Sequence, residues 1–350
     1  MGTDTNILPQ NNSFLIGQLE AEAVFLRAWK NDSLHHAWIL SGPMGVGKAT
    51  LAYRIARFLL WADENKKEQY SSLDVPENSD IFQQIACGSY PDLMVLERDY
   101  IETDRKKIIS AIRKGEAMSE DELAGLKKSA YIRVDDVRKV TEFLSKTSFN
   151  DNWRIIILDS ADDMNRSASN ALLKILEEPP SKTILLLISH NPSLLLPTIR
   201  SRCAKLPLHV LQNNEVASLL RRYRPELDEQ DVNALSNISE GSIGKALIYA
   251  DTNAVSIYER LCGLLYAKRN MSILKLSDFC TEMAKDAQKF DILQELIVKL
   301  LKENMCSCAD KEELYACFNE TRQMFADCTS VNMDKKMMLI TLLTEISKAL

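Results

Sequence analysis

The fold of this chain is decided by residues 37–50, which read AWILSGPMGVGKAT. The first four residues form a short apolar run that predicts a buried strand, and the residues after Lys48 have helical periodicity. A glycine-rich loop that joins a strand to a helix and ends in lysine is typical of a phosphate-binding loop. Its backbone N–H groups can point at an anion, and the start of the helix adds positive potential. The sequence therefore predicts a phosphate loop of the Walker A type.

The residues expected to bind a nucleotide at this loop are Gly42, Gly45, Gly47, Lys48, Ala49 and Thr50. The glycines allow the backbone to curl, and the lysine would reach the terminal phosphates. The motif wants Ser or Thr for magnesium directly after the lysine, but Ala49 stands there. Thr50 is one residue further on, about 100° around the helix axis, and is a poor substitute. These residues leave open whether ATP or ADP occupies the loop or whether it is kept empty.

A second nucleotide motif follows at residues 154–158, which read RIIIL and precede Asp159. An apolar strand that ends in aspartate has the form of a Walker B motif, whose carboxylate faces the metal ion. Hydrolysis also needs a carboxylate next to it to polarise the attacking water, and the residue present is Ser160. Because Ala49 and Ser160 fall at the two positions that hydrolysis most needs, we expect little or no intrinsic ATPase activity.

The first part of the chain alternates strand-like runs with helical patterns, which predicts a parallel sheet covered by helices. The expected strands are Ala37–Leu40, Leu93–Glu97, Trp153–Leu158, Thr183–Ile188 and Ala204–Leu208. The expected helices between them lie near Glu20–Trp29, Ala49–Trp61, Val134–Lys146 and Ala168–Glu177. Residues 98–128 are dense in charges without a long apolar stripe, so we expect a solvated surface excursion there.

Beyond the sheet, helical patterns alone continue to the end of the sequence, with a break near Asp251 and Thr252. We therefore expect three domains. These are an α/β nucleotide-binding domain over residues 1–210, a small helical bundle over 211–250 and a longer helical domain over 251–350.

Composition excludes several other classes of protein. The 350 residues carry a net charge of −6, so a broad basic face for nucleic acid is not expected. The polar start is not a secretory signal and the longest apolar runs are too short for a bilayer, so we expect a cytoplasmic protein without a membrane partner. The eight cysteines lack paired CxxC spacing, which favours reduced thiols.

Two later stretches carry a family resemblance. Residues 170–180 read NALLKILEEPP, and residues 201–203 read SRC just before the last expected strand. Both resemble the subunits of bacterial clamp loaders, and residues 14–18, which read FLIGQ, fit the same family. The resemblance implies a P-loop AAA+ domain followed by a helical lid and an all-α collar domain through which subunits assemble.

Within this family the motor subunits, gamma and tau, keep both nucleotide motifs intact. This chain combines degraded motifs with the SRC triplet, which implies a non-motor subunit. The resemblance assigns Arg202 as an arginine finger that acts in trans on a neighbour's γ-phosphate. It also implies gamma or tau and delta subunits as partners, and the sliding clamp and primer–template DNA through the assembled complex. From the residues alone, a lone arginine would more often be a surface charge.

Two alternatives remain open from the residues. The chain could be a working AAA+ ATPase that uses Thr50 and Asp162 in unusual positions, or an inert scaffold in which Arg202 is idle. Many relatives hold zinc with four cysteines between the phosphate loop and the next strand. Because this chain has only Cys87 in that interval, we expect no bound metal.

Overall fold

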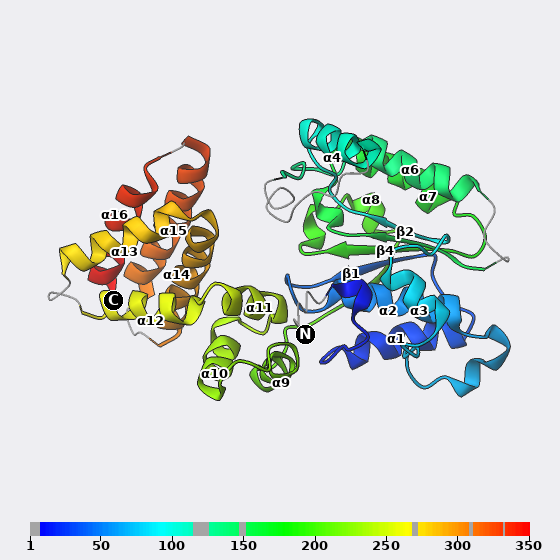
Figure 1. The fold of residues 1–350 in the computed structure, drawn as a ribbon, viewed down its shortest axis with the longest axis horizontal. Coiled ribbons are helices and arrows are strands. Elements are labelled where there is room, and N and C mark those ends of the chain that lie inside the picture. Colours follow the sequence, from blue (N-terminus) through cyan, green and yellow to red (C-terminus); the bar gives the residue numbers. More distant parts are fainter. Residues whose placement is uncertain (1–7, 115–125, 147–151, 268–271, 308–310, 332) are drawn as a thin grey trace. The chain divides into compact units, whose positions relative to one another are not determined.

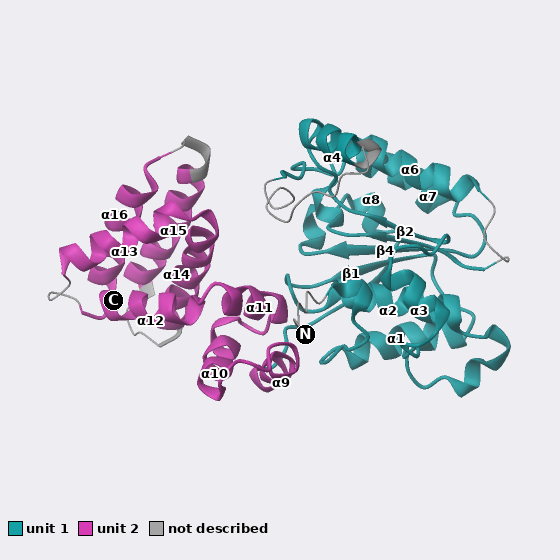
Figure 2. Ribbon diagram, viewed as in Figure 1, with its two compact units in different colours: residues 1–212 teal, residues 213–350 magenta. Residues whose placement is uncertain are grey.

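The computed structural model describes residues 8–350 with the exception of 115–125, 147–151, 268–271, 308–310 and 332. The chain forms two compact units, unit 1 over residues 1–212 and unit 2 over residues 213–350 (Figure 2). The boundary between the units lies close to the predicted end of the α/β domain. The further division near residue 250 into a lid and a collar stays a prediction.

Unit 1 is built on a five-stranded parallel sheet in the order β2-β3-β4-β1-β5. The strands are β1 (Ala37–Ser41), β2 (Leu93–Leu96), β3 (Arg154–Leu158), β4 (Thr183–Ser189) and β5 (Ala204–Pro207). Each strand lies where an apolar run predicted it. Parallel strands covered on both faces read as continuous apolar runs, and every residue of the central strand β4 is buried. The predicted α/β fold class is confirmed.

Helices cover both faces of this sheet (Figure 1). One face packs against α1 (Leu19–Lys30), α2 (Lys48–Trp61) and α3 (Asp80–Ala86). The other packs against α6 (Val134–Ser145), α7 (Arg166–Glu177) and α8 (Pro197–Arg200). All four helices that we predicted for this region are present, and α3 and α8 are additional.

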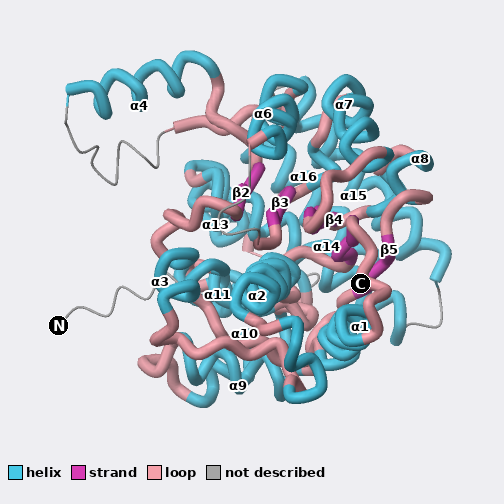
Figure 3. Tube along the Cα trace, turned by 90° about the vertical axis from the view of Figure 1, so that its right-hand side faces the viewer, coloured by secondary structure: helices cyan, strands magenta, loops and turns pink. Residues whose placement is uncertain are grey.

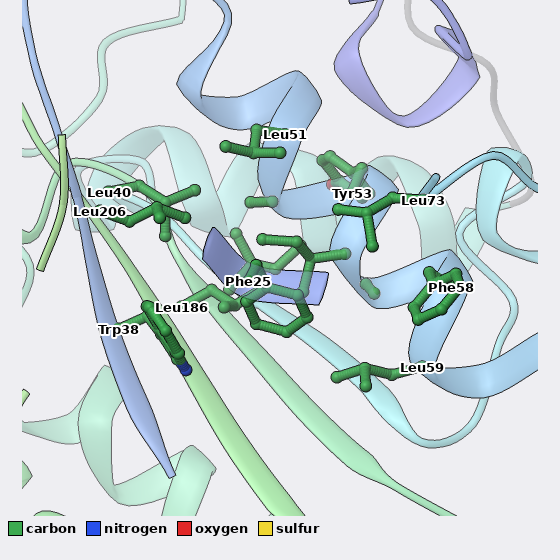
Figure 4. Packing of buried hydrophobic residues seen from close by; sticks show 14 of the residues in the cluster. Phe25, Trp38, Leu40, Leu51, Tyr53, Phe58, Leu59, Leu73, Leu186 and Leu206 are labelled. Carbon is green, nitrogen blue, oxygen red and sulfur yellow. The ribbon is translucent and has the colours of Figure 1, made fainter. Parts of the chain in front are cut away.

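Alternate residues of β1 serve the two faces, as the pleat of a strand requires. Trp38 and Leu40 pack with Phe25 of α1 and Phe58 of α2 in a core, part of which is shown in Figure 4. The Trp38 and Phe25 rings lie 5.3 Å apart between centroids. Ile39 packs on the opposite face. Burial on both sides explains why the first four residues of the strand that precedes the phosphate loop are apolar.

The charged excursion contains a regular helix, α4 (Glu102–Lys114), which the sequence analysis did not predict. Its described side chains are mostly exposed, as expected for a surface excursion. The remaining elements of unit 1 are the short 3-10 helices Pro9–Asn11, Glu64–Gln69, Ala161–Asp163 and Pro192–Leu194.

Unit 2 is helical throughout its described secondary structure, as predicted. Its helices are α9 (Asn213–Tyr223), α10 (Glu229–Ile238), α11 (Ile243–Asp251), α12 (Ala254–Leu265), α13 (Ile273–Lys285), α14 (Ala287–Ser307), α15 (Lys311–Val331) and α16 (Lys335–Ala349). Asp228 and Ser242 cap α10 and α11 by accepting backbone N–H groups of the first turn. Within the described part of the chain, no helix has both the length and the apolar character needed to cross a membrane.

Candidate functional site

The phosphate loop connects the carboxyl end of β1 to the first turn of α2. Gly42, Gly45 and Gly47 have φ angles of 150°, 77° and 98°, which favour glycine. A Cβ atom at Gly42 would lie 2.4 Å from the carbonyl oxygen of Leu208, and one at Gly47 would lie 2.6 Å from Cδ1 of Leu15. The backbone carbonyl leaves no space for a side chain at Gly42, whereas the Leu15 side chain could move away from Gly47, where the positive φ is the main requirement for glycine.

Lys48 lies buried inside the curl of this loop, with 3% of its surface exposed. Its Nζ donates to the carbonyl oxygens of Gly42 at 2.7 Å and Pro43 at 2.5 Å. Burial lowers the pKa of Lys48 to about 8, against the opposing attraction of the Asp159 and Asp162 carboxylates. The loop glycines and this ammonium group fit the phosphates of a nucleotide.

The phosphate loop lacks the side-chain hydroxyl that would bind a magnesium ion. Ala49 contributes only a methyl group, and Thr50 is buried on the next position of α2. The residues of the loop can thus hold phosphate but lack the hydroxyl that would bind its metal ion. Among the described residues, no group of three or more His, Cys, Asp and Glu side chains is placed to hold a metal ion.

Asp159 follows β3 at the carboxyl edge of the sheet, where the phosphate loop also lies. Burial raises the pKa of Asp159, while the nearby His190 and Lys48 act in the opposite direction. Ser160 adopts a left-handed conformation with φ 60°, and its Oγ lies 3.3 Å from Nε2 of His190. The position that a hydrolytic enzyme gives to a carboxylate thus holds a hydroxyl paired with imidazole.

Asp162 binds the end of β4. Its carboxylate accepts hydrogen bonds from Oγ of Ser189 at 2.6 Å, from the backbone N–H of Asn191 at 3.0 Å and from the backbone N–H of His190. Asn191 in turn accepts from the N–H of Ser193 at 3.2 Å. Three hydrogen bonds occupy the Asp162 carboxylate, which supports a structural cap rather than a relocated catalytic base.

Arg202 lies at the opposite edge of the sheet from the phosphate loop. It precedes the amino end of β5, whereas the loop leaves the carboxyl end of the adjacent parallel strand β1. A five-residue strand spans about 16 Å. Nη2 of Arg202 lies 2.9 Å from Oε1 of Glu177, and Nη1 donates to the carbonyl oxygen of Thr198 at 3.2 Å. The site residues predicted from sequence therefore form two groups. The phosphate-loop residues and Asp159 lie at the carboxyl ends of the strands, and Arg202 lies at the amino end of β5.

Residues 17–212 match the family model described as DNA polymerase III, delta subunit. The chain belongs to this family. It is 35% identical over 170 residues to a DNA polymerase III subunit delta' of Pseudomonas aeruginosa, covering 49% of this chain and 42% of that protein. A subunit delta' of Bacillus subtilis is 26% identical over 237 residues, covering 66% of this chain and 61% of that protein.

A DNA polymerase III subunit gamma of Buchnera aphidicola is 26% identical over 243 residues, covering 68% of this chain and 57% of that protein. The chain thus spans about half the length of these three curated relatives, between 42% and 61%. The resemblance that the motifs predicted is confirmed at the level of the DNA polymerase III delta family.

Gln18 is a site residue of this DNA polymerase III family member to which the sequence assigned no role. It is buried, and its Nε2 donates to the carbonyl oxygens of Val46 in the phosphate loop at 3.2 Å and of His209 at 2.8 Å. Its Oε1 accepts from the N–H of His209 at 3.2 Å. Gln18 thus joins the loop to the segment that leaves β5. The signal was a polar residue that ends the apolar run FLIGQ.

Proposed function

We propose that the chain acts as the delta-prime subunit of a DNA polymerase III clamp loader. In this role it is a stator that completes the ATP site of a neighbouring motor subunit with Arg202 and hydrolyses little ATP itself. The observation that carries the proposal is the placement of Arg202 at the edge of the sheet opposite to Lys48. Family membership and the relatives named subunit delta' support it.

The chain's own nucleotide site supports the non-motor half of the proposal. Ala49 removes the magnesium ligand of the phosphate loop, and Ser160 removes the carboxylate that would act on water. Asp162 is engaged in hydrogen bonds to the end of β4 and is not available as a substitute. ATP or ADP would bind through the loop glycines and Lys48, and the chain would supply no hydrolytic step.

The position of Arg202 supports action in trans. Because the length of the adjacent strands β1 and β5 separates it from its own phosphate loop, it cannot reach a γ-phosphate bound there. Its side chain is 38% exposed, and an ion pair with Glu177 and a hydrogen bond to the carbonyl oxygen of Thr198 hold the planar guanidinium at the end of α7. An exposed arginine held in this way can be presented to a second subunit, where its permanent charge stabilises the transition state of phosphoryl transfer.

The partners in this proposal are gamma or tau motor subunits and a delta subunit. Assembly would use the helical unit 2, and the assembled loader would act on the sliding clamp and on primer–template DNA. The stator would remain rigid while the motor subunits bind ATP. The extensive buried apolar core of unit 1 is compatible with that rigidity.

The test is the DNA-stimulated ATPase rate of a loader reconstituted with this chain. We expect Arg202→Ala to abolish the share of turnover that comes from one motor site, since comparable fingers contribute about 10³ to 10⁵ in rate. Lys48→Ala should leave the rate nearly unchanged, because the chain's own site does not hydrolyse ATP.

Arg221→Ala is the matched control, because Arg221 is also an exposed arginine in an ion pair, with Glu229 at 2.8 Å. It should leave turnover unchanged. Loss of turnover with Lys48→Ala and not with Arg202→Ala would show that the chain is a motor. No change with either variant would leave the chain as an inert scaffold and overturn the proposal.

A further inference from the structure

The described part of the charged excursion in unit 1 consists of helix α4 and a short stem. Residues 99–101 and 127–129 pair as antiparallel segments, and the N–H of Ile101 donates to the carbonyl oxygen of Lys127 at 2.9 Å. The buried carboxylate of Asp104 accepts from the N–H of Lys127 at 3.0 Å. These bonds fix the first turn of α4 to the end of the stem, and the helix projects from unit 1 (Figure 3).

Helix α4 is basic in an acidic protein. Residues 102–114 contain five basic and two acidic side chains, a net charge of +3, whereas the whole chain has a net charge of −6. Three of the basic residues are consecutive, Arg105, Lys106 and Lys107. Cations stabilise the carboxyl end of a helix rather than its amino end, so helix stability does not account for their place in the first two turns.

The three cations are accessible. Their side chains are 48%, 74% and 66% exposed. Each has one carboxylate neighbour, at distances of 2.7 to 3.5 Å, namely Asp99, Glu102 and Asp104. Lys107 is held by the buried Asp104, whereas the more exposed pairs of Arg105 and Lys106 contribute little to stability and are screened by salt. A polyanion can therefore compete with these carboxylates for the basic side chains.

The apolar content of α4 argues against a lipid surface as the polyanion. Helices that lie on membranes carry a broad face of large apolar residues such as Trp, Phe and Leu. Helix α4, which reads ETDRKKIISAIRK, has none of these three. Of its described side chains Ile109 is 39% exposed, and Ile108 and Ala111 are half-buried. The exposed side chains described on this helix therefore include three cations and a single large apolar residue, Ile109.

We propose that helix α4 is a contact site for the phosphate backbone of DNA, carried by this chain itself and used without reading base sequence. The helix supplies charges from Arg105, Lys106 and Lys107, and the stem of residues 99–101 and 127–129 anchors its first turn to unit 1. Phosphate contacts of this kind position a protein on DNA and carry no sequence information. The choice of DNA rests on membership of the DNA polymerase III family, and the trans role of Arg202 is not required.

The test is binding of the full-length chain to a short fluorescent DNA duplex with a single-stranded extension, at about 50 to 200 mM salt. We expect Lys106→Gln/Lys107→Gln to weaken binding at the lowest salt by about tenfold or more. It should also reduce the slope of log affinity against log salt by about 1 to 2, since each lost phosphate contact contributes close to 1.

The matched control is Lys66→Gln/Lys67→Gln, which changes the same residue types in unit 1. Lys66 and Lys67 are also adjacent and paired with carboxylates, those of Asp63 and Asp32. It should retain wild-type affinity and salt slope. Equal loss in both variants, or no binding by the wild-type chain at the lowest salt, would overturn the proposal. So would binding to anionic phosphatidylglycerol vesicles that depends on Lys106 and Lys107 while DNA binding does not.

This test is separate from the test of the proposed function, because it needs neither a motor subunit nor ATP. A chain that binds DNA through α4 but has an idle Arg202 would retain this inference and lose the stator proposal. A chain that does not bind DNA through α4 but whose Arg202 is needed for loader ATPase would retain the stator proposal and lose this inference.

Discussion

The guanidinium of Arg202 is paired with Glu177 at the last residue of α7, with Nη2 2.9 Å from Oε1. The two side chains are 38% and 50% exposed, and ion pairs at such exposure contribute about 0 to 1 kcal/mol. The pair therefore orients the arginine more than it stabilises the fold. We expect Arg202→Ala and Glu177→Gln each to lower the free energy of unfolding by less than about 1 kcal/mol in urea titrations. A larger loss would mean that ATPase defects of Arg202→Ala reflect misfolding.

The close contact at Gly42 in the phosphate loop predicts that a side chain there would destabilise the fold. Gly42→Ala should cost at least about 2 kcal/mol, because its Cβ would collide with the carbonyl oxygen of Leu208 and its φ is 150°. Gly263→Ala is the control, since Gly263 lies in α12 with open space around its Cβ position. That substitution should stabilise the chain by about 0.5 to 1 kcal/mol. Thermal unfolding of the two variants should shift the midpoint in opposite directions.

The buried ammonium group of Lys48 predicts how the free energy of unfolding depends on pH. Burial lowers its pKa to about 8 from 10.5, so between these values the unfolded chain binds more protons than the folded chain. Stability rises with pH wherever the unfolded state binds more protons. Relative to Lys48→Met, the free energy of unfolding of the wild type should rise by about 1.4 kcal/mol per pH unit above pH 8 and be flat below it. Parallel curves from pH 7 to about 10 in nucleotide-free urea titrations would contradict a buried ammonium group.

Substitution of Asp162 tests whether its carboxylate is a structural cap or a catalytic base. Asp162→Ala removes the acceptor for three hydrogen bonds at the end of β4 and should cost about 2 to 3 kcal/mol. The neighbouring Asp163→Ala breaks a partly exposed pair with Arg98, 3.2 Å apart, and should cost less than about 1 kcal/mol. Neither should change the ATPase rate of an assembled loader. A large ATPase loss with Asp162→Ala at normal assembly would restore the alternative of a working ATPase.

The fold of unit 1 was predictable because its strands are buried on both faces. Runs such as residues 154–158 have no polar residue in their interior and are too short for a helix, so strand was the natural prediction. The phosphate loop was predictable for a different reason, since its glycines answer a local need for positive φ at Gly45 and Gly47.

The tertiary partners in the site were not predictable. Gln18 meets His209 across 191 residues of sequence, and Asp162 meets Ser189 across 27, through side chains whose residue types are common on surfaces. No local sequence pattern predicts such contacts, because the order of strands in the sheet brings these distant residues together. Helix α4 was missed because its charges dominate its composition, while its anchor is the single buried carboxylate of Asp104.

The order of strands in unit 1 has a consequence for synthesis on the ribosome. Strand β1 is made first yet pairs with β4 and β5, the last two strands to be made. Its edge toward β4 stays unpaired until 148 further residues have been made, from Ser41 to Ser189, and its edge toward β5 until 166 have been made, from Ser41 to Pro207. Synthesis of such a length takes about 10 to 30 s at ordinary elongation rates. During that time an apolar strand with two open edges is a target for chaperones and for aggregation. Faster translation between β1 and β5 would therefore shorten the vulnerable period without altering any native contact.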